Sequence, residues 1–347
     1  MLTLIIFLII LGSIVFFHEL GHFIFAKKAG IYVYEFSLGF GPKLFSFKRK
    51  NDETEYMIKA IPLGGYVAMA GEEDLEEDDK LKIPDDKKLY NKSWIQRLFV
   101  MIAGVMNNFI LGFILLFIIG LCNGSVFNTN EIDNIMKDYP LYNAGVRDKD
   151  KIIEVNHKKV KNYDDIQTEL AIVKPNSKVN FKIEKTDGKT KDISIKPKYS
   201  KKDKTYYYGI SIKSYEEKGI VSALKYAGYK FKSIYKSMII VIECLFTGKV
   251  GLNSLSGPVG IYSVVGSAKA SIIALLYLTA YLSINVGFIN LIPFPAFDGG
   301  RVLFLIIEKI KGSKINPKIE NTINSIGFML LMLLMVIITV KDVLNLF

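Results

Sequence analysis

The stretch FFHELGHFIF, residues 16–25, places two histidines and a glutamate inside the first apolar segment of the chain. That segment runs from Met1 to Ala26 and is followed by Lys27 and Lys28. About 20 apolar residues suffice to cross a bilayer as a helix, so the segment is long enough to span. It has neither a basic start nor a small-residue cleavage pattern, which argues against a signal peptide. We expect a retained span that carries three ionisable side chains.

Three further apolar runs have a similar length. They are Leu98–Cys122, Ala270–Phe297 and Ile323–Val340. The chain of 347 residues is 50% hydrophobic and 23% charged, too apolar for an ordinary soluble enzyme and too charged to lie wholly in lipid. The expected fold class is therefore a polytopic α-helical membrane protein with four transmembrane helices and additional water-facing parts.

The loop between the first two spans, residues 27–96, predicts a β-hairpin. KLFSFKRK (43–50) and EYMIKAIP (55–62) alternate apolar and polar residues on either side of NDET (51–54). The glycine-rich pieces GFGP and PLGG outside them are typical of turns. The highly charged stretch 71–88 predicts a solvated segment.

The region between the second and third spans predicts a mixed α/β domain. Residues 150–160 and 178–197 read as short strands, with a hairpin turn at TDGK (186–189) and helical spacing over 162–173. The size of this domain is that of a PDZ module.

Residues 219–246 have apolar side chains at helical spacing, with lysines offset from them. This pattern indicates an amphipathic helix lying on the membrane surface. A helix packed on the preceding domain explains it equally well.

Orientation follows from the lysines beside the spans, because short cytoplasmic loops carry an excess of positive charge. The loops around 27–96 and 312–322 are the basic ones, so we expect them in the cytoplasm and the N-terminus and PDZ-like domain outside.

The net charge of +11 comes from scattered lysines, which favours anionic lipid headgroups as partners and not nucleic acid. With two cysteines, a disulfide framework and a cysteine metal site are excluded.

The expected segments follow in chain order: helix 1 (1–26), cytoplasmic loop with hairpin (27–96), helix 2 (97–122), extracytoplasmic domain (123–213), amphipathic membrane-surface region (214–269), broken helix 3 (270–311), cytoplasmic loop (312–322), and helix 4 with the tail (323–347).

His18 and His22 are four residues apart and share one face of a helix. Two imidazoles at that spacing can hold one Zn²⁺, and Glu19 beside them can act as the general base for a water molecule. The alternative is a pair of histidines satisfied by neighbouring helices, with Glu19 protonated. An ionisable group near the bilayer centre costs about 2.5–3.5 kcal/mol, which favours the metal site.

A catalytic zinc usually has three protein ligands and an open position. His157 lies in the soluble domain and is expected as an exposed turn residue. Asp298 follows Pro293 and Pro295, which must break the third helix inside the membrane. Broken helices at membrane depth line buried or wet cavities, so we predict Asp298 as the third ligand, at the start of a half-helix. A plain helix-capping role is the alternative.

HELGH and NLIPFPAFDGG, on either side of a PDZ-like insert, resemble the bacterial site-2 proteases. These are zinc metalloproteases that cleave substrates within the membrane. GFGPKLFSF and IPLGGYVAMAGEE resemble the membrane-associated hairpin of that family, and LSGPVGIY (255–262) resembles the segment before its third span. The single PDZ-like domain resembles the form that releases sigma factors by cleaving membrane-bound anti-sigma factors.

The resemblance implies that His18, His22 and Asp298 bind one zinc ion and that Glu19 is the base. It implies that Asn290 holds substrate or steadies the active site. AGVMNNF resembles a family pattern A-G-P-x-x-N-F, with Asn108 at the asparagine position and valine in place of the proline.

The implied substrates are single-pass membrane proteins, either anti-sigma factors or remnant signal peptides, in the bacterial cytoplasmic membrane. The hairpin between Lys43 and Pro62 is expected to offer an edge strand that pairs with the extended substrate. Bulky residues at Gly64 and Gly65 should therefore impair cleavage yet spare zinc. The PDZ-like domain either binds peptide or acts as a size filter.

Two other functions compete with this one. A membrane zincin that cleaves soluble segments takes its third ligand from a downstream glutamate, for which Glu308 and Glu243 are the candidates. A non-catalytic receptor would bind extracytoplasmic tails through the PDZ-like domain and hold structural zinc. Glu19 argues against the receptor, because a structural site needs no base.

Overall fold

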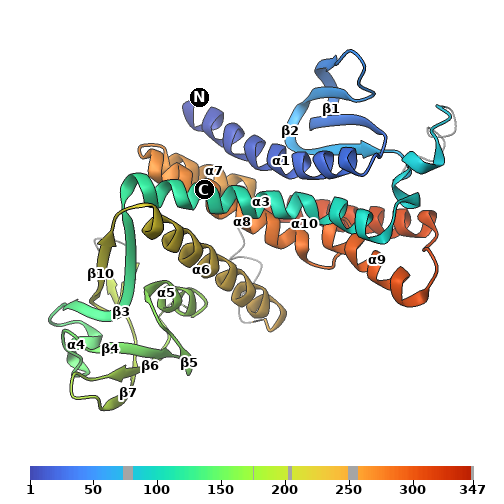
Figure 1. Ribbon diagram of the computed structural model, residues 1–347. Coiled ribbons are helices and arrows are strands. Elements are labelled where there is room, and N and C mark those ends of the chain that lie inside the picture. The colour runs from blue at the N-terminus through green and yellow to red at the C-terminus, as the bar shows by residue number, and fades with distance from the viewer. Residues whose placement is uncertain (73–80, 175, 202–204, 249–256, 345–347) are drawn as a thin grey trace. The chain divides into compact units, whose positions relative to one another are not determined.

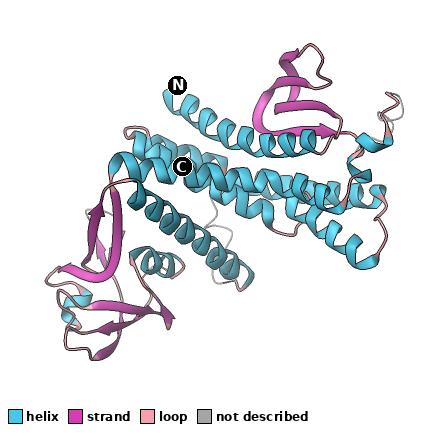
Figure 2. Cartoon of the chain, viewed as in Figure 1, coloured by secondary structure: helices cyan, strands magenta, loops and turns pink. Residues whose placement is uncertain are grey.

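The computed structural model describes residues 1–72, 81–174, 176–201, 205–248 and 257–344 (Figure 1). The chain forms two compact units, Met1–Leu116 with Asn253–Phe347, and Phe117–Leu252. Long helices dominate the first unit, and most of the strands belong to the second (Figure 2). Each unit has its own cluster of buried apolar side chains.

Four helices in the described residues are long and apolar enough to cross a membrane. They are α1 (Leu2–Lys28), α3 (Trp94–Asn123), α8 (Ile272–Leu291) and α10 (Pro317–Leu344). The four predicted spans are thus confirmed as helices. Because α3 continues without a break through Val105, the valine in place of the family proline leaves this helix regular.

The third apolar run is broken where its prolines predict. Helix α8 ends at Leu291, and α9 (Asp298–Lys311) begins after a tight turn. The turn is so close that a Cβ on Gly299 would lie 2.3 Å from the carbonyl oxygen of Leu291. Phe297 is the N-cap of α9, so Asp298 is the first residue of the half-helix and the capping role considered for it is wrong.

Strands β1 (Val33–Lys48) and β2 (Glu55–Met69) form the predicted hairpin, but both are longer than the sequence pattern indicates. Residues 43–48 pair with 55–59, and residues 35–38 pair with both 55–58 and 65–68. GFGP and PLGG are therefore not outer turns. Gly39 and Gly64 have positive φ angles of 90° and 109° and lie at irregularities that bend the strands. Within the described residues, 65–69 form an edge of this small sheet.

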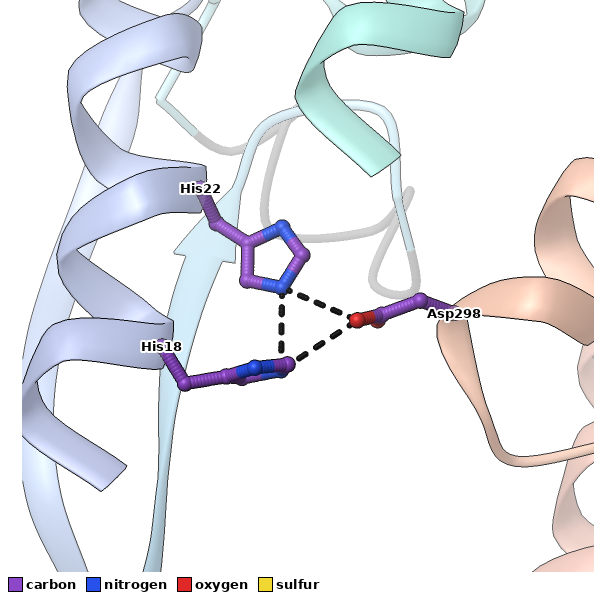
Figure 3. A group of neighbouring side chains, drawn as sticks. All are labelled: His18, His22 and Asp298. Carbon is purple, nitrogen blue, oxygen red and sulfur yellow. Dashed lines mark hydrogen bonds and ion pairs between the residues drawn. The ribbon is translucent and has the colours of Figure 1, made fainter. Parts of the chain in front are cut away.

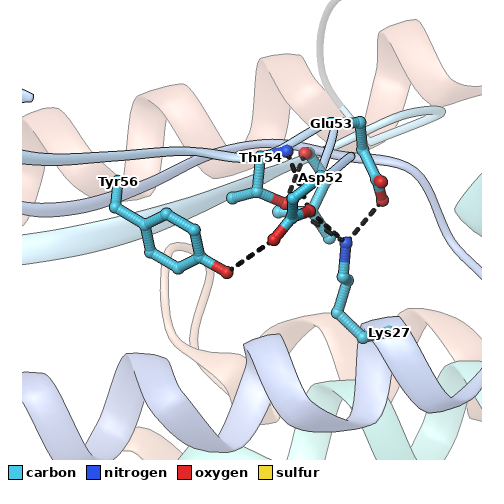
Figure 4. Close-up of polar contacts among 6 residues, drawn as sticks. Lys27, Asp52, Glu53, Thr54 and Tyr56 are labelled. Atoms are coloured by element: carbon cyan, nitrogen blue, oxygen red, sulfur yellow. Dashed lines mark hydrogen bonds and ion pairs between the residues drawn. The ribbon is translucent and has the colours of Figure 1, made fainter. Parts of the chain in front are cut away.

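Lys27 ties the hairpin turn to the end of α1, where its amine contacts two acidic side chains (Figure 4). Lys27 Nζ lies 2.9 Å from Asp52 Oδ1 and 2.6 Å from Glu53 Oε1. The buried Thr54 hydroxyl donates to the Val33 carbonyl at 3.0 Å, and Tyr56 donates to Asp52 Oδ2 at 2.9 Å. These bonds hold the sheet against the helix that carries HELGH.

The last helix is held at two points of the first unit. Near its middle, a Cβ on Gly327 would lie 2.6 Å from Pro295 in the turn before α9. Near its end, Asp342 Oδ2 accepts hydrogen bonds from the backbone N–H groups of Gly257 and Gly260, at the start of α7 (Pro258–Ala268). Helix α10 therefore packs against the broken segment that positions Asp298.

The short elements between the hairpin and α3 are the 3-10 turns η1 (Asp85–Lys87) and η2 (Leu89–Asn91). Part of the predicted solvated segment, 73–80, lies outside the described residues.

The second unit is the mixed α/β region that the sequence predicts. Its main sheet has the strand order β10-β3-β4-β6-β7, and a core of apolar residues such as Phe181 and Ile166 lies against it. His157 is exposed in a turn, as expected. The likeness to a PDZ module and the domain boundaries remain predictions. The elements are β3 (Ser125–Ile135), α4 (Pro140–Asn143), β4 (Lys151–Val155), β5 (Lys158–Lys159), α5 (Tyr163–Ala171), β6 (Val179–Glu184), β7 (Thr190–Ile195), β8 (Lys198–Ser200), β9 (Thr205–Tyr207) and β10 (Ile210–Glu217).

Helix α6 (Ile220–Phe246) packs on α5 and β3 of the same unit. Lys230 contacts Asp164 and Lys236 contacts Asp165, each at 2.7 Å. This packing agrees with the second explanation of the amphipathic pattern, and a membrane-surface position for the region stays a prediction.

The Asp52→Asn variant is expected to lose stability at neutral pH and not in acid. Burial raises the pKa of Asp52, but hydrogen bonds from Lys27, the Thr54 N–H and Tyr56 outweigh this effect and hold the pKa at about 2. Because this value lies below the ordinary 3.8, the carboxylate stabilises the fold above about pH 4 and loses that effect as the pH falls toward 2. Thermal unfolding in detergent should show a lower midpoint for the variant at pH 7 and a shrinking difference below pH 4.

Asp86→Asn is the matched control, because Asp86 is exposed in the same loop between α1 and α3. Its unfolding midpoint should follow that of the parent at each pH. A deficit of Asp52→Asn that stays constant down to pH 2 would contradict the proposed role of the carboxylate.

Candidate metal centre

Three metal-ligating side chains from two distant parts of the chain converge in the first unit (Figure 3). His18 and His22 project from α1, and Asp298 projects from the first turn of α9. The two Nε2 atoms are 3.3 Å apart, and Asp298 Oδ2 lies 3.2 Å from His18 Nε2 and 3.4 Å from His22 Nε2. The structure thus brings together the three residues predicted as ligands.

The spacing of these donor atoms fits a zinc ion. Zinc prefers a tetrahedral set of nitrogen and oxygen donors at about 2.0–2.2 Å, which puts the donors about 3.3–3.6 Å from one another. The observed triangle has sides of 3.2, 3.3 and 3.4 Å. Two imidazoles and one carboxylate leave a fourth position open, as a catalytic site requires.

Both histidines are oriented by groups on α3. His22 Nδ1–H donates to the Val100 carbonyl at 2.8 Å, which leaves the lone pair of Nε2 for a metal. The amide of Asn108 is fully buried, with its nitrogen 3.1 Å from His18 Nδ1 and its oxygen without a partner among the described residues. The two ends of an amide have similar size, and turning Oδ1 toward His18 Nδ1–H frees Nε2 of His18 as a ligand. Asn108 is thus placed to orient one ligand.

Two glycines allow α1 and α3 to approach at this point. A Cβ on Gly21 would lie 2.3 Å from the Ala103 carbonyl oxygen. A Cβ on Gly104 would lie 2.3 Å from His22 Nε2 and 2.7 Å from His18 Cε1. Gly104 stands in the AGVMNNF motif, yet sequence reasoning selected Asn108 and missed this glycine. The signal that could indicate Gly104 is that small residues are enriched where membrane helices cross closely.

A cavity of about 1040 Å³ lies beside the three donors. Glu19, Asn290, Gly64 and Gly65 all line it, so the remaining predicted site residues share one space with the ligand triangle. A Cβ on Gly65 would lie 3.1 Å from Glu19 Cγ and 2.7 Å from the Ser37 carbonyl oxygen. The edge strand therefore passes directly over the predicted base.

The helix α10 contributes a wall of this cavity that the sequence reasoning did not anticipate. Its lining residues recur at helical spacing and are Asn321, Asn324, Ser325, Phe328 and Met329. The Ala296 N–H donates to Asn324 Oδ1 at 3.4 Å, which connects this wall to the turn before Asp298.

The two alternative carboxylates have other partners. Glu308 is buried and pairs with Arg97 at 2.6 Å, and its second oxygen accepts from the Ile315 N–H at 2.9 Å. Glu243 belongs to the second unit, where Lys158 lies 3.9 Å away. Asp298 is the carboxylate that meets the histidines.

The Gly104→Ala variant is expected to bind zinc at least tenfold more weakly than the parent. The added methyl group would overlap both imidazoles, and disturbing the groups around metal ligands typically costs about 10–100-fold in affinity. The measurement is zinc content after dialysis against graded chelator concentrations.

Gly12→Ala is the matched control, because a Cβ on Gly12, in the interior of α1, meets nothing within 4 Å. Equal zinc retention by parent, Gly104→Ala and Gly12→Ala would show that the helices can separate at no cost to the site.

Comparison with known proteins agrees with this geometry. The family model for Peptidase family M50 matches residues 6–334. The chain is 34% identical to the regulator of sigma-W protease RasP of Bacillus subtilis and 32% identical to the zinc metalloprotease RasP of Shouchella clausii, covering 99% of each chain in both cases. It is also 36% identical to a Clostridium acetobutylicum protein, covering 96% of this chain and 94% of that one. This chain therefore belongs to peptidase family M50, the site-2 proteases that its two motifs resemble.

Proposed function

We propose that this chain is a zinc metalloendopeptidase that hydrolyses peptide bonds within transmembrane segments of other proteins. The observation that carries the proposal is the triangle of His18, His22 and Asp298 beside Glu19, with both histidines on α1, a helix long and apolar enough to cross a membrane. The zinc metalloprotease named in Shouchella clausii, similar over nearly its whole length, supports zinc as the cofactor.

The residues around the triangle have distinct roles in this mechanism. The chemistry that zinc supplies at such a site is Lewis acidity, which activates water and polarises the scissile carbonyl. Glu19 takes the proton from the attacking water and passes it to the leaving amine. Val100 and Asn108 hold the two imidazoles, and Asn290 lines the cavity where it can contact the substrate backbone.

The substrate must be extended to react, because a helix hides its amides in hydrogen bonds. We propose that it pairs with residues 65–69, which line the cavity and are an edge of the small sheet among the described residues. Residues 43–48, within the hairpin between Lys43 and Pro62 where the sequence predicts the edge, form the other edge of this sheet among the described residues. They do not line the cavity, so 65–69 are the edge that we propose for the substrate. Side chains of the substrate would then alternate toward and away from Glu19.

The proposed substrates are single-pass membrane proteins, namely anti-sigma factors or remnant signal peptides. The name of the Bacillus subtilis relative connects that protein to sigma-W regulation, which supports the first class. We propose the bacterial cytoplasmic membrane as the location, with the N-terminus and the second unit outside, as the lysine distribution favours. The second unit then acts on the outer part of the substrate, as a PDZ-like peptide binder or as a size filter.

The Glu19→Gln variant is expected to retain zinc and lose cleavage. Removing a general base lowers the rate by about 10²–10⁴-fold, whereas the three donors remain in place. The test is cleavage of a transmembrane model substrate by purified protein in detergent, with zinc measured in parent and variant. If both hold zinc and neither cleaves several unrelated substrates, the protease proposal fails and a non-catalytic receptor with structural zinc takes its place.

The Gly65→Val variant is expected to retain zinc and to cleave at least tenfold more slowly. Its Cβ would lie 3.1 Å from Glu19 Cγ and 2.7 Å from the Ser37 carbonyl oxygen, at the cavity wall proposed for the substrate, and none of the three nearest atoms belongs to a donor residue. Ala60→Val is the matched control, because Ala60 is exposed on the same strand. Normal cleavage of several substrates by Gly65→Val would count against substrate pairing at residues 65–69.

A further inference from the structure

An ion pair joins the end of the edge strand to the helix of the third metal-ligating residue. Glu72 follows β2 by three residues, and its carboxylate contacts the guanidinium of Arg301 on α9. The side chains are only 13% and 25% exposed, so this is not a solvated surface pair. Nothing in the proposed mechanism uses either residue.

The backbone around Glu72 is held in one conformation. Gly71 has a φ of +75°, and a Cβ there would lie 2.7 Å from the Tyr90 ring and 2.8 Å from Lys88 Cβ. Ala70 accepts a hydrogen bond from the Leu89 N–H at 2.7 Å and donates one to the Tyr32 carbonyl at 2.9 Å. The turn after the edge strand is therefore fixed, and it directs Glu72 toward α9.

Arg301 lies one helical turn after Asp298, on the same side of α9. The start of this helix is itself held, since the Gly300 N–H donates to the Phe297 carbonyl at 3.0 Å. Arg301 and Asp298 therefore keep a fixed offset within one turn of α9.

Both members of the pair line the cavity beside the metal-ligating residues and also an adjoining cavity of about 200 Å³. The pair thus stands between the two spaces, at the end of the strand that crosses over Glu19. A partly buried ion pair is weak as a source of stability, because desolvation offsets much of the attraction. Its best-attested use is to specify one arrangement of the elements that it joins.

We infer that Glu72 and Arg301 are a positioning pair, which fixes the register of the edge strand relative to Asp298. The inference rests on the proposed proteolysis and on substrate pairing with residues 65–69. A substrate strand paired there presents one particular peptide bond to the metal centre only if the strand and α9 keep a constant offset. The pair therefore determines which bond is cut as well as how fast.

The test compares Glu72→Gln, Arg301→Gln and the double variant with the parent. Zinc content should be unchanged, and kcat/KM of Glu72→Gln should fall about 10–100-fold, as small misplacements of reacting groups do. Mass spectrometry of the products should show cleavage spread to neighbouring bonds, chiefly two residues away, since side chains of a strand alternate with period two. In the Arg301→Gln background, Glu72→Gln should lower kcat/KM less than twofold, because the partner of Glu72 is already gone.

Glu55→Gln is the matched control, because Glu55 pairs with Lys43 on the exposed part of the same hairpin at 2.7 Å. It should keep both the parental rate and the single cleavage site. Loss of zinc in parallel with activity, an unchanged cleavage site, or an equal cost of Glu72→Gln in both backgrounds would overturn the inference.

A second measurement separates this inference from the proposed function. In the Glu19→Gln background, a photo-crosslinker at Ala68, which lines the cavity, should capture a transmembrane model peptide at one position. Adding Glu72→Gln should spread the capture over several positions. If the parent does not cleave, the protease proposal fails, and an unchanged crosslinking pattern would independently reject the positioning pair.

Discussion

The close crossing of α1 and α3 is the contact on which the rest of the site depends. Two histidines and a glutamate on an apolar helix are costly in lipid unless another helix covers and hydrogen-bonds them. Gly21 and Gly104 let the two backbones approach, and Asn107 adds a hydrogen bond to the Phe17 carbonyl at 3.0 Å. Because the helices are this close, Val100 and Asn108 reach the Nδ1 atoms of the two imidazoles. The Nε2 atoms are thus left for a metal.

The third donor, Asp298, depends on an interruption of regular helical structure. A continuous helix through residues 272–311 would bury its backbone in its own hydrogen bonds. Pro293 and Pro295 prevent this, and the resulting turn places Asp298 at the first position of α9, opposite the histidines. The turn is in turn enclosed by Gly327 of α10 and by the Asn324 side chain. The crossing of α1 and α3 therefore positions the two histidines, and the break between α8 and α9 positions Asp298.

The sequence predicts those parts of the molecule that follow from local periodicity and from special residues. Four apolar runs, the i and i+4 histidines, the proline break and the alternation in the hairpin are local signals, and each has its counterpart in the structure. Contacts between segments far apart in the chain give weaker signals in the sequence than these local patterns do. Gly104, Glu72 and the wall formed by α10 are important because of what lies opposite them, and no spacing along the chain reports that.

The hairpin is longer than its sequence pattern predicts, because two glycines that indicate turns lie inside its strands. Glycine beside proline normally indicates a turn, yet here Gly39 and Gly64 bend strands that continue past them. The bend lets residues 35–38 pair on both sides and sends 65–69 back over α1, where Gly65 meets Glu19. The glycines are thus needed for a close approach, and a straight hairpin of the predicted length would end before reaching the metal centre. In this fold the irregular positions, more than the regular ones, determine which residues lie beside Glu19 and the three donors.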